Sequence, residues 1–177
     1  TALEHKQMVQ FNCSDWDFIN TRAEANGMLF ISKTGKVEVI KPNPSPEAKF
    51  ELSYGLTIIE SELEIDNRYA FNDYEARGWN YTEQEIEKGS SDIPVLSEEG
   101  NLSAAKLSED SKMEKYVYSN GGNLNQKELN EILNAKKIKS LLGKIRGVVK
   151  CIGKNEVETG DKIKLSGLGG RFKGKAF

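Results

Sequence analysis

Hydrophobic and polar residues near the start of the chain follow a pattern that predicts one helix and then a β-hairpin. Ser14 is a suitable N-cap, and apolar residues recur after it at helical spacing as far as Asn26–Gly27. Glycine takes the left-handed conformation that ends helices, so we expect the helix to stop there. Residues 28–33 and 36–41 have strand character, and the two-residue turn at Thr34–Gly35 joins them.

A second region has a period of two and predicts a pair of strands. Along residues 56–65, apolar residues fall on one face, and Glu60, Glu62 and Glu64 fall on the other. Residues 69–79 are rich in aromatic residues and also have strand character. We expect these two strands to form an extended antiparallel hairpin with one solvated face.

The rest of the chain predicts two further helices and then a return to strands. A polar stretch follows Gly89, and it is expected to hold a short helix near residues 102–109. Residues 125–142 carry apolar side chains at helical spacing and predict the second main helix. Strands are expected at 145–152 and 162–165.

These elements predict an α+β fold with mostly antiparallel strands, small barrel-like subdomains and two main helices. The prolines at positions 42, 44 and 46 interrupt backbone hydrogen bonding and mark a boundary between two subdomains. We expect a helix-plus-hairpin subdomain at residues 1–47. A barrel-like subdomain is expected at 48–177, with a polar helical insertion at about 90–142.

Composition narrows the functional classes. The chain has 177 residues, a net charge of −2 and 29% charged residues, so it lacks the basic surface that nucleic-acid binding requires. No segment approaches the roughly 20 apolar residues that span a membrane. Cys13 and Cys151 lie far apart in apolar surroundings, which favours two buried free thiols over a disulfide.

Residues with the chemistry of a catalytic centre are scarce. His5 is the only histidine, so a Ser-His-Asp or Cys-His arrangement would depend on it, and nothing near it in sequence positions it. The same scarcity argues against zinc, and we expect no metal and no cofactor. The basic, glycine-rich segment 167–175 lacks the spacing of a phosphate-binding loop, and we expect it to connect two strands.

The three glutamates allow several interpretations. They could bind calcium or act in acid/base catalysis, although a solvated strand face is the simpler reading. A more specific hypothesis places them at an interface between subunits or subdomains, opposite Lys162 and Lys164 on another strand. Opposite charges across such an interface select register and partner. Trp79 is a further candidate interface residue.

Two other groups of side chains could bind a ligand. The aromatic residues of segment 69–81 could form a platform for single-stranded nucleic acid or sugar, but packing is the simpler interpretation, and the neighbouring acidic residues disfavour nucleic acid. The lysines of the second main helix are interpreted as a solvated face rather than a membrane-binding surface.

Three segments resemble a known family. The first is residues 12–42, which contain SDWDFINTRAEANGM. The second is residues 56–82, which end in ARGWNYT. The third is residues 143–177, which contain KIRGVVKCIG and VETGDKIKLSGLGGRFKGKAF. They are similar to the Vgr (valine-glycine repeat) proteins of type VI secretion spikes and to the phage late control proteins that form tail baseplate hubs. The resemblance covers a little over half of the chain, and the chain is expected to be a fragment of a hub domain.

The resemblance implies a structural role without enzymatic activity. Copies of the full-length protein would form a homotrimer whose barrels build a pseudo-sixfold ring between a secretion tube protein and a spike or needle domain. Such a protein would start in the bacterial cytoplasm and be secreted as part of the spike, without binding nucleic acid or membrane. The alternatives are a phage or prophage tail hub, a standalone β-barrel that binds a sugar or peptide, and a small hydrolase using acidic residues such as Glu60 and Glu62.

Overall fold

A computed structural model describes residues 8–42, 47–93, 100–153 and 157–176 of the chain. Within these residues, four helices and ten mostly antiparallel strands form an α+β fold, which confirms the predicted class, and none of the small sheets closes into a barrel. In chain order the elements are α1 (Asp15–Ala25), β1 (Leu29–Lys33), β2 (Lys36–Ile40), β3 (Phe50–Ser53), β4 (Ile58–Ile65), β5 (Asp73–Asn80), β6 (Glu85–Ser90), α2 (Ala104–Ser111), β7 (Lys115–Asn120), α3 (Gln126–Leu142), β8 (Ile145–Cys151), β9 (Ile163–Ser166), α4 (Gly169–Phe172) and β10 (Gly174–Ala176).

The hairpin unit, which comprises α1, β1 and β2, has the predicted local structure. The Ser14 hydroxyl caps α1 by accepting a hydrogen bond from the Asp17 N–H at 3.1 Å. Gly27 follows the C-cap with a φ of +65°, a conformation that glycine adopts without a Cβ clash. β1 and β2 pair antiparallel across a two-residue turn, so the helix and the hairpin are both confirmed.

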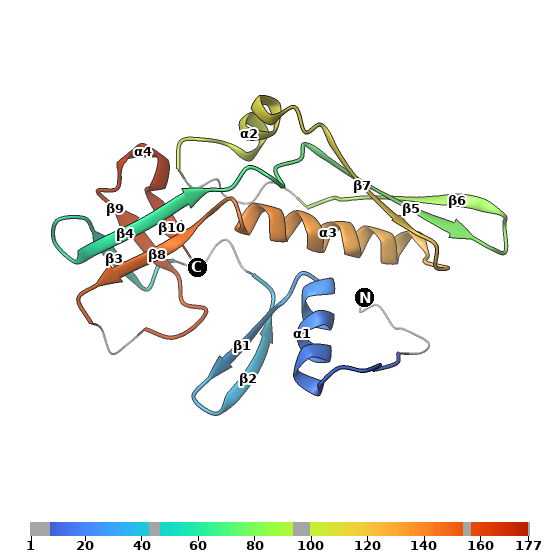
Figure 1. Ribbon diagram of the computed structural model, residues 1–177, viewed down its shortest axis with the longest axis horizontal. Helices are drawn as coiled ribbons and strands as arrows, with labels where there is room; N and C mark the ends of the chain where they lie inside the picture. Colours follow the sequence, from blue (N-terminus) through green and yellow to red (C-terminus); the bar gives the residue numbers. More distant parts are fainter. Residues whose placement is uncertain (1–7, 43–46, 94–99, 154–156, 177) are drawn as a thin grey trace.

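The central unit combines α3 with a three-stranded sheet. β5 lies in the middle of this sheet, antiparallel to β6 and parallel to β7, and α3 runs along the sheet (Figure 1). Tyr74 and Ala76 of β5 pack against Leu129 and Leu133 of α3, and both leucines are fully buried. Asn125 and Glu128 form a reciprocal capping box at the start of α3, which fixes where the predicted helix begins.

The terminal unit contains the remaining strands. β4 and β8 form an antiparallel ribbon, and β9 lies between β3 and β10 in a three-stranded sheet. Leu52, Ile58 and Leu165 form its buried core. The glycine-rich segment after β9 contains α4 and leads into β10, so the prediction that it connects two strands is confirmed.

The predicted hairpin between residues 56–65 and 69–79 is wrong. β4 pairs with β8, and β5 pairs with β6 and β7. The two strands contribute to different cores, because Ile58 of β4 faces Leu165, whereas Tyr74 of β5 faces α3. The chain therefore leaves β4 for a different layer instead of turning back on itself.

The hairpin unit contacts the other two units at a few points. Glu24 of α1 forms an ion pair with Lys139 of α3 at 3.0 Å. Gly27 lies so close to α3 that an added Cβ would come within 3.1 Å of the Cα of Ala135. Gly160 approaches Ile31 even more closely, and a Cβ there would be 2.6 Å from the Ile31 side chain. The division of the chain at residue 47 borders residues that the structure does not describe, and it stays a prediction.

The structure also bears on the cysteines, the two tryptophans and the possibility of a membrane-spanning helix. Neither cysteine forms a disulfide, as expected, but neither thiol is buried, because Cys13 is exposed and Cys151 is partly exposed. The side chains of Trp16 and Trp79 are 52% and 40% exposed. His5 lies outside the described residues. No described helix has both the length and the apolar character needed to cross a membrane.

Candidate functional site

A pocket of about 390 Å³ lies where the central unit meets the terminal unit. The C-terminal end of α3 forms one side, and the segment between β4 and β5 forms another, with contributions from β7 and β8. Three parts of the chain that are far apart in sequence therefore converge at one place: the segment from Asp66 to Tyr74, β7, and the end of α3 with the start of β8. The lining residues are Asp66, Tyr69, Phe71, Tyr74, Tyr116, Lys136, Lys139, Ser140, Gly143 and Arg146.

Aromatic rings form one wall of the pocket. The rings of Phe71, Tyr74 and Tyr116 contact one another, with centroid distances of 5.4 to 6.2 Å. Tyr74 is buried, and this burial raises the pKa of its phenol. Tyr69 is different because 63% of its surface is exposed. The wall thus combines a packed, rigid base with one aromatic side chain that is open to solvent.

Cationic side chains line another part of the pocket. Lys136 and Lys139 lie on the last turns of α3, and Arg146 lies at the start of β8. Lys139 forms an ion pair with Glu24 of the hairpin unit. Lys136 is exposed and makes no ion pair with any other described residue. Because this end of α3 is the negative end of the helix dipole, an anion here would depend on these side chains for its stabilisation.

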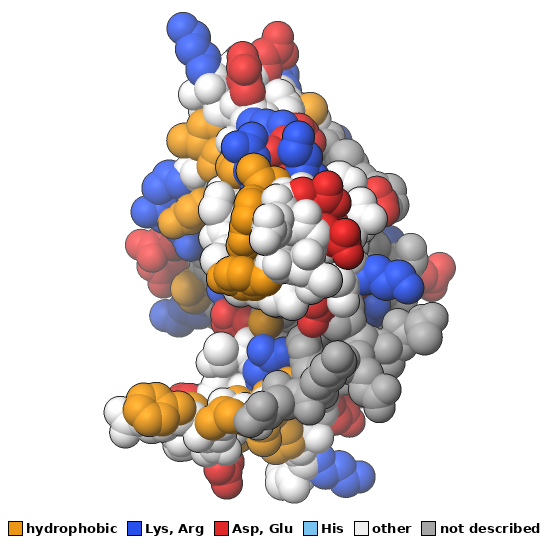
Figure 2. Space-filling model, turned by 90° about the vertical axis from the view of Figure 1, so that its right-hand side faces the viewer, with side chains coloured by type: hydrophobic (Ala, Val, Ile, Leu, Met, Phe, Trp, Pro, Cys, Tyr) orange, Lys and Arg blue, Asp and Glu red, His pale blue; other side chains and the backbone are white. Residues whose placement is uncertain are grey.

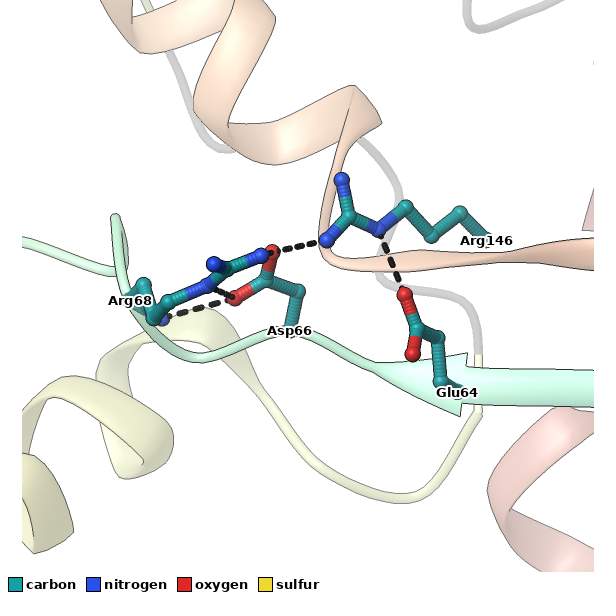
Figure 3. A network of polar contacts seen from close by, with 4 residues as sticks. All are labelled: Glu64, Asp66, Arg68 and Arg146. Carbon is teal, nitrogen blue, oxygen red and sulfur yellow. Dashed lines mark hydrogen bonds and ion pairs between the residues drawn. The ribbon is translucent and has the colours of Figure 1, made fainter.

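A network of four charged residues fixes Arg146 (Figure 3). The Arg146 Nε donates to Glu64 at 2.8 Å, and one terminal nitrogen donates to Asp66. Arg68 donates two side-chain hydrogen bonds to the same Asp66 carboxylate, at 3.0 and 2.7 Å. The hydrogen bonds from Arg68, followed by the charge of Arg146, hold the pKa of Asp66 well below its usual range. In Figure 3 the third nitrogen of Arg146 points away from both carboxylates.

Backbone contacts hold the pocket walls together. Only Gly143 and Lys144 separate α3 from β8. The Asp66 N–H donates to the Lys144 carbonyl at 2.9 Å, and the buried Lys144 ammonium donates to the Leu102 carbonyl at 3.0 Å. The Ser140 hydroxyl donates to the Tyr69 carbonyl. These bonds tie the end of α3 to the segment that carries the aromatic residues.

The predicted acidic strand lies beside the pocket. Glu60, Glu62 and Glu64 share the exposed face of β4. Across the ribbon, Glu60 is 3.8 Å from Lys150, and Glu64 binds Arg146. Among the described residues, no three His, Cys, Asp or Glu side chains gather closely enough to hold a metal ion. Only Glu64 contributes to the site, and it does so by holding Arg146.

The other predicted interface residues lie elsewhere. Within one copy of the chain, Lys164 does not face β4, because it forms an ion pair with Glu51 of β3 at 3.1 Å. Lys162 is buried, with only 8% of its surface exposed. Trp79 lies opposite Ile86 on the β5–β6 ladder. An interface role for these residues stays a prediction.

Sequence reasoning missed most of the pocket. The one sequence feature that could have indicated the pocket was the density of aromatic residues in segment 69–81, but we interpreted these residues as packing rather than as a sugar-binding platform. Tyr116 and Arg146 carried no signal of their own, because only the pairing of β7 with β5 and of β8 with β4 brings them to the site. Lys136 could not be told from the other lysines of α3.

Comparison with known families assigns the chain to a class. The model of the family described as Alg8 N-terminal domain matches residues 1–177, which is the whole chain. The chain therefore belongs to the Alg8 N-terminal domain family. The Alg8 family is a glycosyltransferase family. No curated protein matched the chain in a separate sequence comparison.

This match corrects the identification made from the sequence. The resemblance to Vgr and phage late control proteins is overturned, and with it the predicted role as a structural hub of a secretion spike or tail baseplate. The expectation of no enzymatic activity is also contradicted, because the family is one of glycosyltransferases. The three resembling segments were short structural motifs, and such motifs identify turns and caps better than families.

Proposed function

We propose that this chain contributes a sugar-binding pocket to a glycosyltransferase, with the ligand held between the aromatic wall and Lys136. One observation carries the proposal: the pocket of about 390 Å³ combines an exposed tyrosine with a lysine that has no ion-pair partner among the described residues. Its volume lies in the usual range for small-ligand sites, and such sites often occur where two units of a protein meet. Membership of a glycosyltransferase family supports a sugar as the ligand.

The two walls suit different parts of a charged sugar. A tyrosine ring presents a flat apolar face to the C–H side of a sugar ring, and its hydroxyl can exchange hydrogen bonds with sugar hydroxyls. Lysine is a flexible point charge that binds phosphate or carboxylate, and an arginine nitrogen adds a directional donor. We therefore propose that the ligand carries a negative charge, as either a phosphate or a carboxylate.

Binding measurements with matched probes test this proposal. Calorimetric titrations of the chain with uridine diphosphate, with a uridine diphosphate hexose, with glucuronate and with an uncharged disaccharide separate the two sources of negative charge. We expect binding of at least one charged probe and weaker binding of the uncharged one. The absence of binding to every probe would contradict the proposal.

Two pairs of variants locate the binding site. Tyr69→Ala and Lys136→Ala are expected to weaken binding about tenfold each, because each removes one contact of the ligand. Tyr54→Ala and Lys127→Ala are the matched controls, since Tyr54 is 60% exposed and Lys127 lies at the other end of α3. If the controls weaken binding as much as the pocket variants do, the ligand lies elsewhere.

A further inference from the structure

The outer edge of β2 is not paired with any strand of the described residues. β2 pairs with β1 on one side, and on its other side no strand lies among the described residues. Its residues from Lys36 to Val39 are all exposed. A free strand edge presents backbone N–H and C=O groups that can pair with another strand.

The register of the hairpin shows which residues present these groups. Lys33 and Lys36 flank the two-residue turn as partners, and partners at this position exchange hydrogen bonds with each other. Because hydrogen-bonded pairs alternate along an antiparallel ladder, Val37 and Val39 direct their N–H and C=O groups outward. Position 37 can therefore pair with position 37 of a second, antiparallel copy.

The side chains beside this edge are apolar on one face of the hairpin. Val37 and Val39 are 53% and 47% exposed, and both lie on the same face as Phe30, the partner of Val39. Trp16 of α1 packs against Phe30 with ring centroids 4.5 Å apart, and half of its surface stays exposed. In Figure 2 hydrophobic side chains lie among polar and charged ones at the lower end of the face shown, the end at which the hairpin unit lies.

The charges on the other face select one register. Lys36 makes no ion pair with another described residue, and Glu38 has only a 3.7 Å contact with Lys33. A two-fold axis at Lys36 or at Glu38 would place like charges opposite each other, and an axis at Val39 would place Glu38 opposite Ile40. An axis at Val37 places Lys36 of each copy opposite Glu38 of the other, which is a favourable cross-strand pair.

We propose that two copies of this chain associate through their β2 edges and form a four-stranded antiparallel sheet with the two-fold axis at Val37. A two-fold interface joins the same surface of both copies, so a contact between Lys36 and Glu38 occurs twice, and Val37 on the axis meets Val37 of the other copy. The pairing satisfies the free backbone groups and covers the two valines. It also gives each Lys36 an acidic partner.

Sedimentation equilibrium of the whole chain over a wide concentration range tests the association. We expect a reversible monomer–dimer equilibrium. Val37→Pro removes only an outward-pointing N–H, which an edge strand tolerates, so we expect this variant to keep its circular dichroism spectrum and to be monomeric. A wild-type chain that is monomeric at every concentration would overturn the proposal.

Charge exchange tests the register. Lys36→Glu and Glu38→Lys each place like charges opposite each other twice, and each is expected to raise the dimer Kd about tenfold. The double variant K36E/E38K restores opposite charges and is expected to return the Kd to near the wild-type value. Lys88→Glu makes the same charge change on β6 and serves as the control. A dimer that tolerates Val37→Pro, or that the double exchange does not restore, would disprove pairing through this edge.

Discussion

The hairpin unit and the central unit are built with the same local devices but differ in how well they are packed. Both helices have side-chain N-caps, from Ser14 in α1 and Asn125 in α3. Yet Leu129 and Leu133 of α3 are completely buried, whereas Ala23 is the only residue of α1 that is buried. Local signals therefore specify where a helix starts and ends, and tertiary packing decides how much it stabilises the molecule.

The largest expected difference between the two units is in the cost of truncating an apolar side chain. Leu133→Ala is expected to lower the free energy of unfolding by about 3 kcal/mol, because it leaves a cavity in a closed core. Ile19→Ala in α1 is expected to change it by less than about 0.5 kcal/mol, since 43% of Ile19 is exposed. Urea unfolding followed by circular dichroism measures both values. Equal losses would show that the hairpin unit has a tighter core than its burial indicates.

Removal of the helix caps is expected to give an intermediate effect that sharpens the comparison. Asn125→Ala should lower the free energy of global unfolding by about 1 kcal/mol, because α3 is part of the main core. Ser14→Ala should lower the stability of α1 by a similar amount, but without the same effect on global unfolding.

The two caps differ in where their loss is detected. Because α1 is held by few buried contacts, we expect hydrogen exchange to accelerate in α1 after Ser14→Ala while the global transition stays in place. A matching shift of the global transition in both variants would mean that α1 and α3 unfold as one cooperative unit.

The smallest expected effect is the pH dependence of one ion pair in the central unit. Lys115 and then Arg77 lower the pKa of Glu75 from 4.5 to about 2. A carboxyl group whose pKa is lowered by folding stabilises the folded state above its unfolded pKa, and this contribution disappears as the pH falls through the folded pKa. The stability difference between the wild type and Glu75→Gln should therefore be constant above about pH 5 and shrink between about pH 4.5 and 2.

Unfolding midpoints measured across this pH range test the expectation. Glu85→Gln is the control, because Glu85 forms no ion pair with another described residue. If the stability difference between the wild type and Glu75→Gln grew toward low pH, the ionised Glu75 carboxylate would not be the form that stabilises the fold.

The local part of this fold could be predicted from the sequence, because its signals lie within a few residues. The caps of α1 and α3, the stop at Gly27 and the turn at Thr34–Gly35 all have physical causes that are close in sequence. β6 was missed because its sequence, EIEKGS, is dominated by charged and small residues. Its position depends on pairing with β5 rather than on its own propensity.

The long-range part could not be predicted. The partner of β4 is β8, which lies some 80 residues further along the chain, and no property of the acidic strand indicates a basic partner at that distance. The pocket depends on this pairing, because Arg146 reaches Glu64 and Asp66 only when β8 lies beside β4. Chemistry that is assembled from distant segments needs the tertiary structure before it can be recognised.

The short connection between α3 and β8 has a consequence for how a ligand would bind. Gly143 and Lys144 leave little rotational freedom between the helix and the strand, and hydrogen bonds fix Lys144 on both sides. The walls that these two elements carry are therefore held apart at a set spacing before any molecule arrives. Such a cavity selects its occupant by size and charge rather than by closing around it, and little ordering entropy is lost on entry.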